Sequence, residues 1–394
     1  MIKHLFKLIW NKKRQNFLLM TEMLVSFIVM FAVFTLLVYY YQNYNRPRGF
    51  EYENVWNLGY DTPQGMSDAD SIATFRESLR QLIQSMPQVE EVSFSDANIP
   101  YGYANISTGI SYNKVNWPSE VYTVDDNYKN VLNITMKEGR WFSKADAATN
   151  YRPIVLNETF SKKLFGDQSA TGKIIKDEGS VNKNMKIIGV INDIKDKGDY
   201  TETGNSFFRR MDTSNTNGGG LLLIKIKPTA DAAFESRLFK VLSNAMPNTS
   251  VDIKHMDKRR AIKNAQALGP IVVMLIISGF LIINVALGLF GVLWYNINKR
   301  RGEIGLRRAV GASGGSISKQ LVGEALVLST ISLIVGLFFA VQFPLLSVFD
   351  LAPGTYIIAI LLDILFIYLL VLFCSFYPGK QAAGIYPAEA LHED

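Results

Sequence analysis

Four long apolar stretches set the pattern of this 394-residue chain. One lies near the N-terminus, at residues 17–41, and three come late, at 268–297, 321–349 and 356–377. Each reaches the roughly 20 residues that a helix needs to cross a hydrocarbon layer of about 30 Å. Residues 42–267 instead mix polar and apolar positions, as a folded domain in water does. The pattern predicts four transmembrane helices, with one large domain between the first and the second.

Residues 42–267 contain two similar successions of strand, helix and strand. In each, the helix stops at a Met-Pro pair (residues 86–87 and 246–247), because proline cannot continue a helix. The predicted elements are 54–60, 71–86 and 89–94 in the first unit, and 221–227, 231–246 and 250–254 in the second. We expect the two units to pair into one porter-like α/β subdomain, formed by residues 50–100 and 218–256.

The residues between these two units, 101–217, favour strands. They carry β-branched runs at 154–156 and 186–191, and one short amphipathic helix is expected at 158–164. The predicted fold is therefore an α-helical membrane protein with four transmembrane helices plus a large α+β extracytoplasmic domain between helices 1 and 2. That domain combines a βαβ porter-like subdomain with a β-rich subdomain.

The polar residues before the second apolar stretch predict a helical stalk. No helix-breaking residue occurs from Asp257 until the Gly269-Pro270 pair. A helix from 257 to 297 would be roughly 60 Å long, more than a membrane requires. The alternative is a separate short helix with a bend at Pro270. We expect the continuous stalk.

The net charge of +6 is concentrated beside the apolar stretches. Residues 1–41 hold five basic residues and one acid, whereas residues 42–267 hold 29 basic and 27 acidic residues. Basic residues that flank membrane spans mark the cytoplasmic side, and a nucleic-acid partner would need a basic surface instead. We therefore expect no nucleic acid and place in the cytoplasm the amphipathic segment 1–16, the loop 298–320 and the tail 378–394. The domain 42–267 then lies outside.

The loop 298–320 is dense in basic residues. Six basic residues lie between Lys299 and Lys319, against the single acid Glu303. If the loop is helical, four apolar residues form one stripe with Arg307 and Arg308 beside it: Ile304, Leu306, Ala309 and Val310. Such a helix can lie along the membrane or dock on a soluble partner. The alternative is an orientation signal with no other role.

A few polar and small residues interrupt the apolar stretches. The polar ones are Glu22, Asn284, Glu324 and Asp363. We interpret Asn284 as a helix–helix hydrogen-bonding residue and Asp363 as structural or protonated, since one acid without a cation in the other span centres is a poor proton relay. Glu22 and Glu324 are expected to pair with Lys12, Arg14 or the basic residues 299–308. Close helix packing is expected at Gly279, Gly288 and Gly291.

The sequence shows no motif of a catalytic or metal site. His4, His255 and His392 are far apart, and no His-Glu-x-x-His, Cys-x-x-Cys or Gly-x-Ser-x-Gly occurs. Residues 166–174, GDQSATGKI, look like a phosphate loop, but five residues separate the glycines and Ile174 replaces the magnesium-binding Ser or Thr. A turn is expected there. We predict no enzyme activity, cofactor or metal in this chain, and any ATP hydrolysis comes from another chain.

Three features together resemble the FtsX/MacB-type family of ABC-transporter permeases. The first is the topology of one span, a large outer domain and three further spans. The second is RGEIGLRRAVGA at residues 301–312, followed by EAL at 324–326, and the third is the ending YPGKQAA at 377–383 with YPAEAL at 386–391. Weaker matches to a MacB-like periplasmic domain are GRWF at 139–142, VLNE at 155–158, LFG at 164–166 and IGVI at 188–191.

The resemblance implies a non-enzymatic permease in the bacterial inner membrane. It would pair with a second copy or a paralogue, contact membrane lipid and bind a dimer of ABC ATPase subunits, which hold ATP and magnesium. Motion driven by ATP would reach the outer domain by mechanotransmission and support export or efflux of peptides, drugs or lipoproteins, with an outer-membrane or periplasmic partner as an option. The residues expected to couple to the ATPase are Glu303, Ile304, Gly305, Leu306, Arg307, Arg308 and Gly311.

Other functions remain open at this point. A ligand-binding membrane sensor fits the large outer domain, but no kinase, cyclase or helical signalling module follows any span. A regulator of cell-wall hydrolases of the FtsX type fits the family, although the outer domain is larger than such proteins usually carry. A membrane-anchored hydrolase would need a nucleophile and a base, and no such set is recognisable in the sequence.

Overall fold

The computed structural model describes residues 13–63, 66, 68–175, 184–211, 219–247 and 250–384. The chain divides into two compact units, one of Asn43–Ala267 and the other of Met1–Gln42 together with Leu268–Asp394. Much of the predicted N-terminal segment (1–12) and of the predicted tail (385–394) lies outside the described residues. The unit Asn43–Ala267 is called the outer domain below, and the other the helical unit.

The two predicted β-α-β units form one four-stranded part of the outer-domain sheet. Its strand order is β11-β1-β10-β2, and β10 runs antiparallel to both of its neighbours. The first unit is β1 (Val55–Tyr60), α3 (Ala69–Gln84) and β2 (Val89–Ser95), and the second is β10 (Gly220–Ile226), α6 (Ala232–Ala245) and β11 (Lys254–His255). The interlocking of the two units is that of a split β-α-β arrangement.

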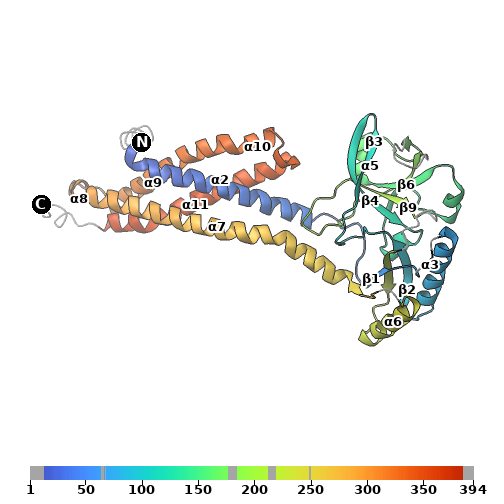
Figure 1. Ribbon diagram of the computed structural model, residues 1–394. Helices are drawn as coiled ribbons and strands as arrows, with labels where there is room; N and C mark the ends of the chain where they lie inside the picture. Colours follow the sequence, from blue (N-terminus) through green and yellow to red (C-terminus); the bar gives the residue numbers. More distant parts are fainter. Residues whose placement is uncertain are drawn as a thin grey trace. The chain divides into compact units, whose positions relative to one another are not determined.

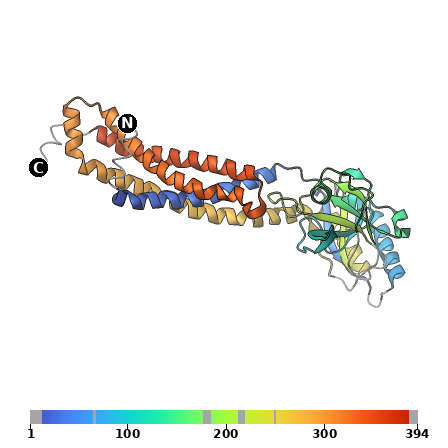
Figure 2. The same cartoon turned by 90° about the horizontal axis from the view of Figure 1, so that it is seen from above.

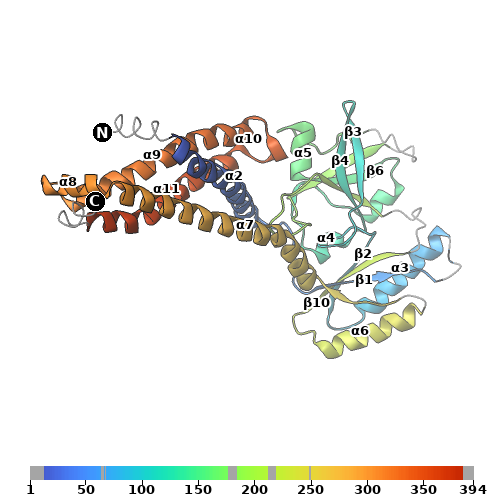
Figure 3. The ribbon, with the colours of Figure 1, turned by 60° about the vertical axis from the view of Figure 1, so that its left-hand side comes forward.

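Both helices cover the same face of these strands (Figure 3). Their apolar residues recur at helical spacing, as Ile72, Leu79 and Ile83 do in α3, so that one side of each helix is buried. Each helix starts at an aspartate whose carboxylate accepts backbone N–H groups, Asp68 for α3 and Asp231 for α6. The local sequence thus specifies where each helix begins and which side it buries.

The strand predicted at 250–254 is largely wrong. Only Lys254–His255 pairs with β1, and helix α7 (Met256–Lys299) starts at the next residue. The apolar residues Val251 and Ile253, which suggested a strand, are partly buried against the core of α3, α6 and the sheet. The alternation of apolar residues therefore reflects burial of these side chains and not pairing in a strand.

The second part of the outer domain is β-rich, as expected. The sheet continues from β2 in the order β4-β9-β6-β8-β5, with β3 beside β4 and β7 beside β8. The strands are β3 (Ser107–Tyr112), β4 (Val115–Val124), β5 (Met136–Gly139), β6 (Arg152–Asn157), β7 (Ile174–Ile175), β8 (Met185–Ile191) and β9 (Ser206–Arg210). The helical pieces are α4 (Tyr128–Val131), the 3-10 helix η1 (Lys144–Ala148) and α5 (Glu158–Phe165).

The segment that looked like a phosphate loop forms a turn. Gly166 ends α5 with a φ of +64°, and Gly172 has a φ of +89° and donates its backbone N–H to the Ile187 carbonyl at 2.8 Å. Both residues use backbone angles that favour glycine. The two glycines therefore allow the chain to turn at these positions.

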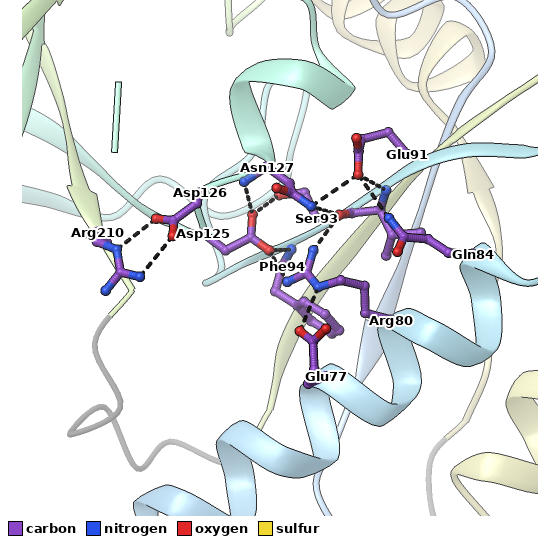
Figure 4. A network of polar contacts seen from close by, with 11 residues as sticks. Glu77, Arg80, Gln84, Glu91, Ser93, Phe94, Asp125, Asp126, Asn127 and Arg210 are labelled. Atoms are coloured by element: carbon purple, nitrogen blue, oxygen red, sulfur yellow. Dashed lines mark hydrogen bonds and ion pairs between the residues drawn. The ribbon is translucent and has the colours of Figure 1, made fainter. Parts of the chain in front are cut away.

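A polar network joins the two parts of the outer domain (Figure 4). The Asp125 carboxylate accepts hydrogen bonds from Arg80 Nη2 and Ser93 Oγ, both at 2.6 Å, and from the backbone N–H of Phe94 at 2.9 Å and of Asn127 at 3.1 Å. Because β2 and β4 pair only through Ser95 and Val124, the ladder itself holds the junction weakly. We call this set the Asp125 network, and it fastens α3 and β2 to the end of β4.

The helical unit contains the four predicted apolar helices. They are α2 (Lys13–Tyr44), α7, α9 (Gly314–Ala340) continued by α10 (Gln342–Leu345), and α11 (Pro353–Ala383); α8 (Arg301–Ala309) and the 3-10 helix η2 (Val348–Asp350) are short. Among the described residues, four helices are long and apolar enough to cross a membrane. Figures 1 and 2 show α9 and α11 side by side. The large α/β domain is inserted between the first and second of them, which confirms the predicted fold class.

The helices of the helical unit differ in extent from the predicted spans. The third helix begins at Gly314, seven residues before the expected start, and its continuation ends at Leu345 instead of residue 349. Helix α11 also runs through Pro378 to Ala383, where a tail was expected from residue 378. Helix α7 is continuous over 44 residues with Pro270 inside it, so the residues before Pro270 do not form the separate short helix that was the alternative to the stalk. Its length is roughly 66 Å at 1.5 Å per residue.

Candidate functional site

The basic loop predicted at 298–320 is mostly helix. Helix α8 follows α7 after the single residue Arg300 and ends in a tight turn at Gly311, whose φ of +104° favours glycine. Ser313 then caps α9 by accepting the backbone N–H of Ser316. The turn is short because Gly311 suits the end of α8 and Ser313 suits the start of α9.

Helix α8 has a buried side and an exposed side. Ile304 is only 5% exposed and packs in a cluster with Ile297, Ile317, Leu321 and Ala382. Leu306 and Val310 are 56% and 82% exposed, respectively. The single stripe predicted for these residues is wrong, because Ile304 lies opposite the others on the helix. Leu306, Ala309 and Val310 remain as an exposed apolar face, called the α8 face below.

Ion pairs fix α8 against the start of α9. Arg300 donates to Glu324 at 3.1 Å and to Glu303 at 3.0 Å, and Arg307 donates to Glu303 at 2.6 Å and to Gln320 at 2.9 Å. The predicted pairing of Glu324 with a basic residue of 299–308 is thus found. We call these residues the Arg300 cluster. Glu303 and Arg307 were both expected to contact an ATPase, and within this chain they form an ion pair with each other.

The two sequence motifs of the helical unit meet at α8. Arg308 donates to the carbonyl oxygen of Ala383 at 2.7 Å, at the end of α11. A Cβ at Gly314 would lie 2.8 Å from that same carbonyl oxygen, and a Cβ at Gly379 would lie 2.6 Å from Ser318 Oγ. A side chain at Gly314 would therefore collide with the backbone at the end of α11, and one at Gly379 would displace the Ser318 hydroxyl. The motif 301–312 and the ending 377–383 form one packed region, which sequence reasoning did not foresee.

The polar residues of the apolar helices take different positions. Asn284 is exposed and donates to the Phe280 carbonyl of its own helix at 2.8 Å, so the interhelical hydrogen bond expected of it is not formed within the described chain. Asp363 is fully buried, and neither carboxylate oxygen has a hydrogen-bond partner among the described residues. Glu22 is half-buried and has no ion pair with the described part of the chain. The side chains of Lys12 and Arg14 lie outside the described structure.

Close helix packing occurs at a glycine that sequence reasoning missed. A Cβ at Gly336 of α9 would lie 2.4 Å from the Phe27 ring of α2. By contrast, a Cβ at Gly279 or Gly291 would meet no atom within 4 Å, and Gly288 is half-buried. The expected packing at the α7 glycines is therefore not seen within one chain, since most of α7's apolar surface is exposed.

A second polar site lies in the outer domain, where the chain enters from α2 and leaves into α7. The Asp199 carboxylate accepts hydrogen bonds from Arg260 Nε and Asn264 Nδ2, both at 2.7 Å, and from Arg48 Nε at 3.4 Å. Beside it, Lys195 Nζ donates to the Asn43 carbonyl oxygen. Arg48 follows α2, and Arg260 and Asn264 belong to the first turns of α7. This Asp199 cluster ties together the entering and the leaving segments.

Electrostatics show that Asp199 is held as a charged group. Burial would raise the pKa of its carboxyl, but hydrogen bonds from Arg260 and Asn264, together with the positive charges of Arg260 and Arg48, outweigh burial and lower it. No sequence motif marks the cluster, because Arg48, Asp199 and Arg260 are far apart in the chain. The available signal was the charge density of residues 257–264 before an apolar stretch.

Comparisons with known proteins agree with this arrangement. Residues 23–238 match the family model of the MacB-like periplasmic core domain, and residues 275–387 match that of the FtsX-like permease C-terminal region. The chain is 24% identical over 307 residues to a macrolide export ATP-binding/permease protein MacB of Bdellovibrio bacteriovorus, which covers 72% of this chain and 45% of that protein. For the MacB protein of Chlorobaculum tepidum, the identity is 24% over 338 residues, covering 82% and 50%, respectively.

The chain thus spans about half the length of the curated relatives it matches. Among solved structures, the periplasmic region of MacB from Actinobacillus actinomycetemcomitans aligns with a TM-score of 0.39 and 17% identity, over 57% of this chain and 98% of that one. The two family models together cover the outer domain up to residue 238, most of α2, α7 from residue 275 onward, and all of α8, α9 and α11. This chain belongs to the FtsX/MacB-like family of ABC transporter permeases and is a membrane protein with an extracytoplasmic domain.

Proposed function

We propose that this chain is the permease subunit of an ABC transporter and that α8 docks on a separate nucleotide-binding subunit. The observation that carries the proposal is the α8 face. Leu306 and Val310 are exposed on a short helix that is otherwise anchored by the buried Ile304 and by the Arg300 cluster. An exposed apolar face on a rigid helix suits a hydrophobic groove on a partner protein.

The anchoring explains how docking is able to move the helical unit. Arg300 ties α8 to Glu324 of α9, and Arg308 ties it to Ala383 of α11. A push on α8 would therefore reach both helices through charge-assisted hydrogen bonds. Within the proposal, ATP and magnesium bind to the partner subunit, and this chain performs no hydrolysis.

Motion reaches the outer domain, we propose, through α7. The helix has no break between Met256 and Lys299, and its first turns join the Asp199 cluster inside the outer domain. A tilt of α7 would therefore act directly on Asp199 and, through Arg48, on the segment that follows α2. This scheme is mechanotransmission, in which a rigid element transfers a displacement between two sites.

The exposed apolar surface of α7 supports a second permease copy or a paralogue as a partner, alongside membrane lipid. Ile276, Phe280 and Leu287 are each more than 60% exposed in the single chain. Helix pairing in membranes relies on such packing surfaces.

The two relatives named above are described as macrolide export proteins, so we propose export or efflux of drugs, peptides or lipoproteins for this chain. A periplasmic or outer-membrane partner would complete that route.

The proposed location is the bacterial cytoplasmic membrane, with both termini and α8 on the cytoplasmic side. The support is the bias of basic residues, because six lie between Lys299 and Lys319 and five precede the first span. Accessibility labelling of a single cysteine placed at Lys319, in a Cys374→Ser background, tests it. Labelling only after the membrane is permeabilised agrees with the proposal, and labelling of intact cells contradicts it.

The test of coupling uses the complex in lipid nanodiscs. We expect Leu306→Asp with Val310→Asp to abolish stimulation of ATP turnover by the permease, because charged residues on the α8 face oppose docking in an apolar groove. Thr108→Asp, on an exposed outer-domain strand, is the matched control and should leave turnover unchanged. Normal stimulation in the double variant, at normal expression, would contradict the role given to α8.

A further inference from the structure

The outer domain contains a pocket that the proposed function does not use. It lies between the loop after β2, the start of β10 and the first turn of α7, and its volume is about 420 Å³. Pockets that hold small molecules usually measure about 300–1,000 Å³. Its wall is mostly apolar, with Ala97, Ala104 and Leu221 beside backbone of three glycines. The size fits a small molecule.

One cationic side chain in this pocket lacks a partner. Arg259 is only 7% exposed, and its Nε is buried with no hydrogen-bond partner among the described residues. No carboxylate of the described chain lies within ion-pair distance of it. A buried charge without a partner is unfavourable, so proteins pair such groups or use them to bind ligands. The unpaired guanidinium marks a place for an anion.

The aromatic ring beside Arg259 does not replace that partner. The guanidinium carbon lies 5.0 Å from the centre of the Tyr103 ring, which also lines the pocket. A stacked ring engages the face of a guanidinium, whereas its N–H groups point outward in its plane. Those N–H groups match the two oxygens of a carboxylate or phosphate. The Tyr103 ring therefore lies against Arg259 without supplying a hydrogen-bond acceptor to its N–H groups.

Charge around the pocket favours an anion near Tyr103. Lys254 and Lys263 place their Nζ atoms 5.9 and 6.0 Å from the centre of the same ring. Asp252 pairs with Lys254 at 2.9 Å, so only part of this positive charge is neutralised. Asp96 is the one acid among the described lining residues, and its carboxylate accepts the backbone N–H of Ala97 at 3.0 Å.

We propose that this pocket binds a small organic anion. Its carboxylate or phosphate group pairs with Arg259, and its apolar body lies against Leu221 and Tyr103. Since Arg259 belongs to α7, the bound molecule touches the helix that continues into the second apolar stretch. The site does not depend on the proposed function, because it requires no ATPase and no second copy.

The test is calorimetric titration of the full chain in nanodiscs of zwitterionic lipid, with empty nanodiscs as the baseline. The probe is 1-naphthyl phosphate, which joins an aromatic body to an anion. We expect saturable binding of one molecule per chain. We also expect at least tenfold weaker binding of 1-naphthol, which lacks the charge, and of inorganic phosphate, which lacks the body. Tighter binding of phosphate alone would identify a simple anion site and overturn the proposal.

Variants assign the binding to the pocket. Arg259→Gln should weaken binding at least tenfold, and Arg237→Gln should not change it, because Arg237 also stacks on a ring, Phe234, but is exposed elsewhere in the outer domain. Ala104→Phe fills the pocket from its exposed wall without altering Arg259, so it separates lost binding from misfolding. Absent binding up to millimolar probe, or binding as tight as that of the native chain in Arg259→Gln or in Ala104→Phe, would overturn the proposal.

Discussion

The outer domain and the α8 region both organise their polar residues around ion pairs, but they bury them differently. Asp125 and Asp199 are 14% and 4% exposed at their side chains, and each accepts three or more hydrogen bonds. In the Arg300 cluster, Glu303 and Arg307 are both 45% exposed. Breaking a buried pair leaves an uncompensated charge, whereas an exposed pair is replaced by water. The comparison indicates that buried pairs, Arg300–Glu324 of α8 among them, provide rigidity, whereas the exposed Glu303–Arg307 pair on α8 is available for rearrangement.

The largest effect should follow the loss of Asp125. Asp125→Ala removes the acceptor of four hydrogen bonds and leaves Arg80 without its buried partner, so we expect about 3 kcal/mol of destabilisation of the outer domain. Hydrogen exchange of β2 and β4 in the full chain measures it. Glu77→Ala is the matched control, because Glu77 also pairs with Arg80 but is exposed. Equal protection in the two variants would contradict the importance given to burial.

Asp199→Asn should have a smaller effect, of about 2 kcal/mol, because Arg48 and Arg260 are partly exposed and are able to find water. The lowered pKa of Asp199 predicts that its contribution is full above pH about 4 and is lost below it, as the carboxylate takes up a proton. Thermal unfolding at a series of pH values measures both. A variant that keeps the acid sensitivity of the native chain would show that Asp199 is not its source.

Asp196 should make the stability of the folded chain depend on pH in the opposite direction. Its carboxyl is buried next to Glu120, which raises its pKa to about 7, while Tyr122 donates a hydrogen bond to it and Lys197 pairs with Glu120. The folded chain then binds a proton that the unfolded chain has released, so stability falls as pH rises from about 4 to about 7. Asp196→Asn should flatten this slope, since an amide still accepts the Tyr122 hydroxyl. An unchanged slope would show that another group is responsible.

The smallest effect is expected at Glu303. Glu303→Gln removes exposed ion pairs with Arg300 and Arg307 and should change the stability of the helical unit by less than about 1 kcal/mol. Glu324→Gln is the matched comparison, because Glu324 pairs with Arg300 where both side chains are 15% exposed. Its effect should be larger. If Glu303→Gln proves the more damaging, the contrast between exposed and buried pairs fails.

Local pattern accounts for most of the fold that the sequence predicted. The apolar stretches and the helices α3, α5 and α6 are visible in short windows, because spacing and capping residues act over a few positions. The strand predicted at 250–254 failed because burial of Val251 and Ile253 does not require strand pairing. Boundaries near Gly314 and Pro378 also depend on packing between α9 and α11, which no short window contains.

The candidate sites were harder to predict for the same reason. The orientation of Ile304 depends on Ile317 and Ala382, one of which is almost 80 residues away. The Asp199 cluster joins Arg48 to Arg260 across most of the outer domain, so no motif reveals it. The close approach at Gly336 depends on Phe27 of another helix. Sequence alone indicates that α8 is basic and amphipathic, and the structure identifies which face is free.

The central claim is that the α8 face binds a nucleotide-binding subunit. The most direct measurement is purification of the intact chain from its native membranes in mild detergent, followed by mass spectrometry of the proteins that accompany it. The account predicts a stoichiometric ATPase with a Walker A motif, lost when Leu306→Asp and Val310→Asp are introduced and retained with Thr108→Asp. Purification of the chain without such an ATPase, from membranes in which ATPases of this kind are detected, would contradict it.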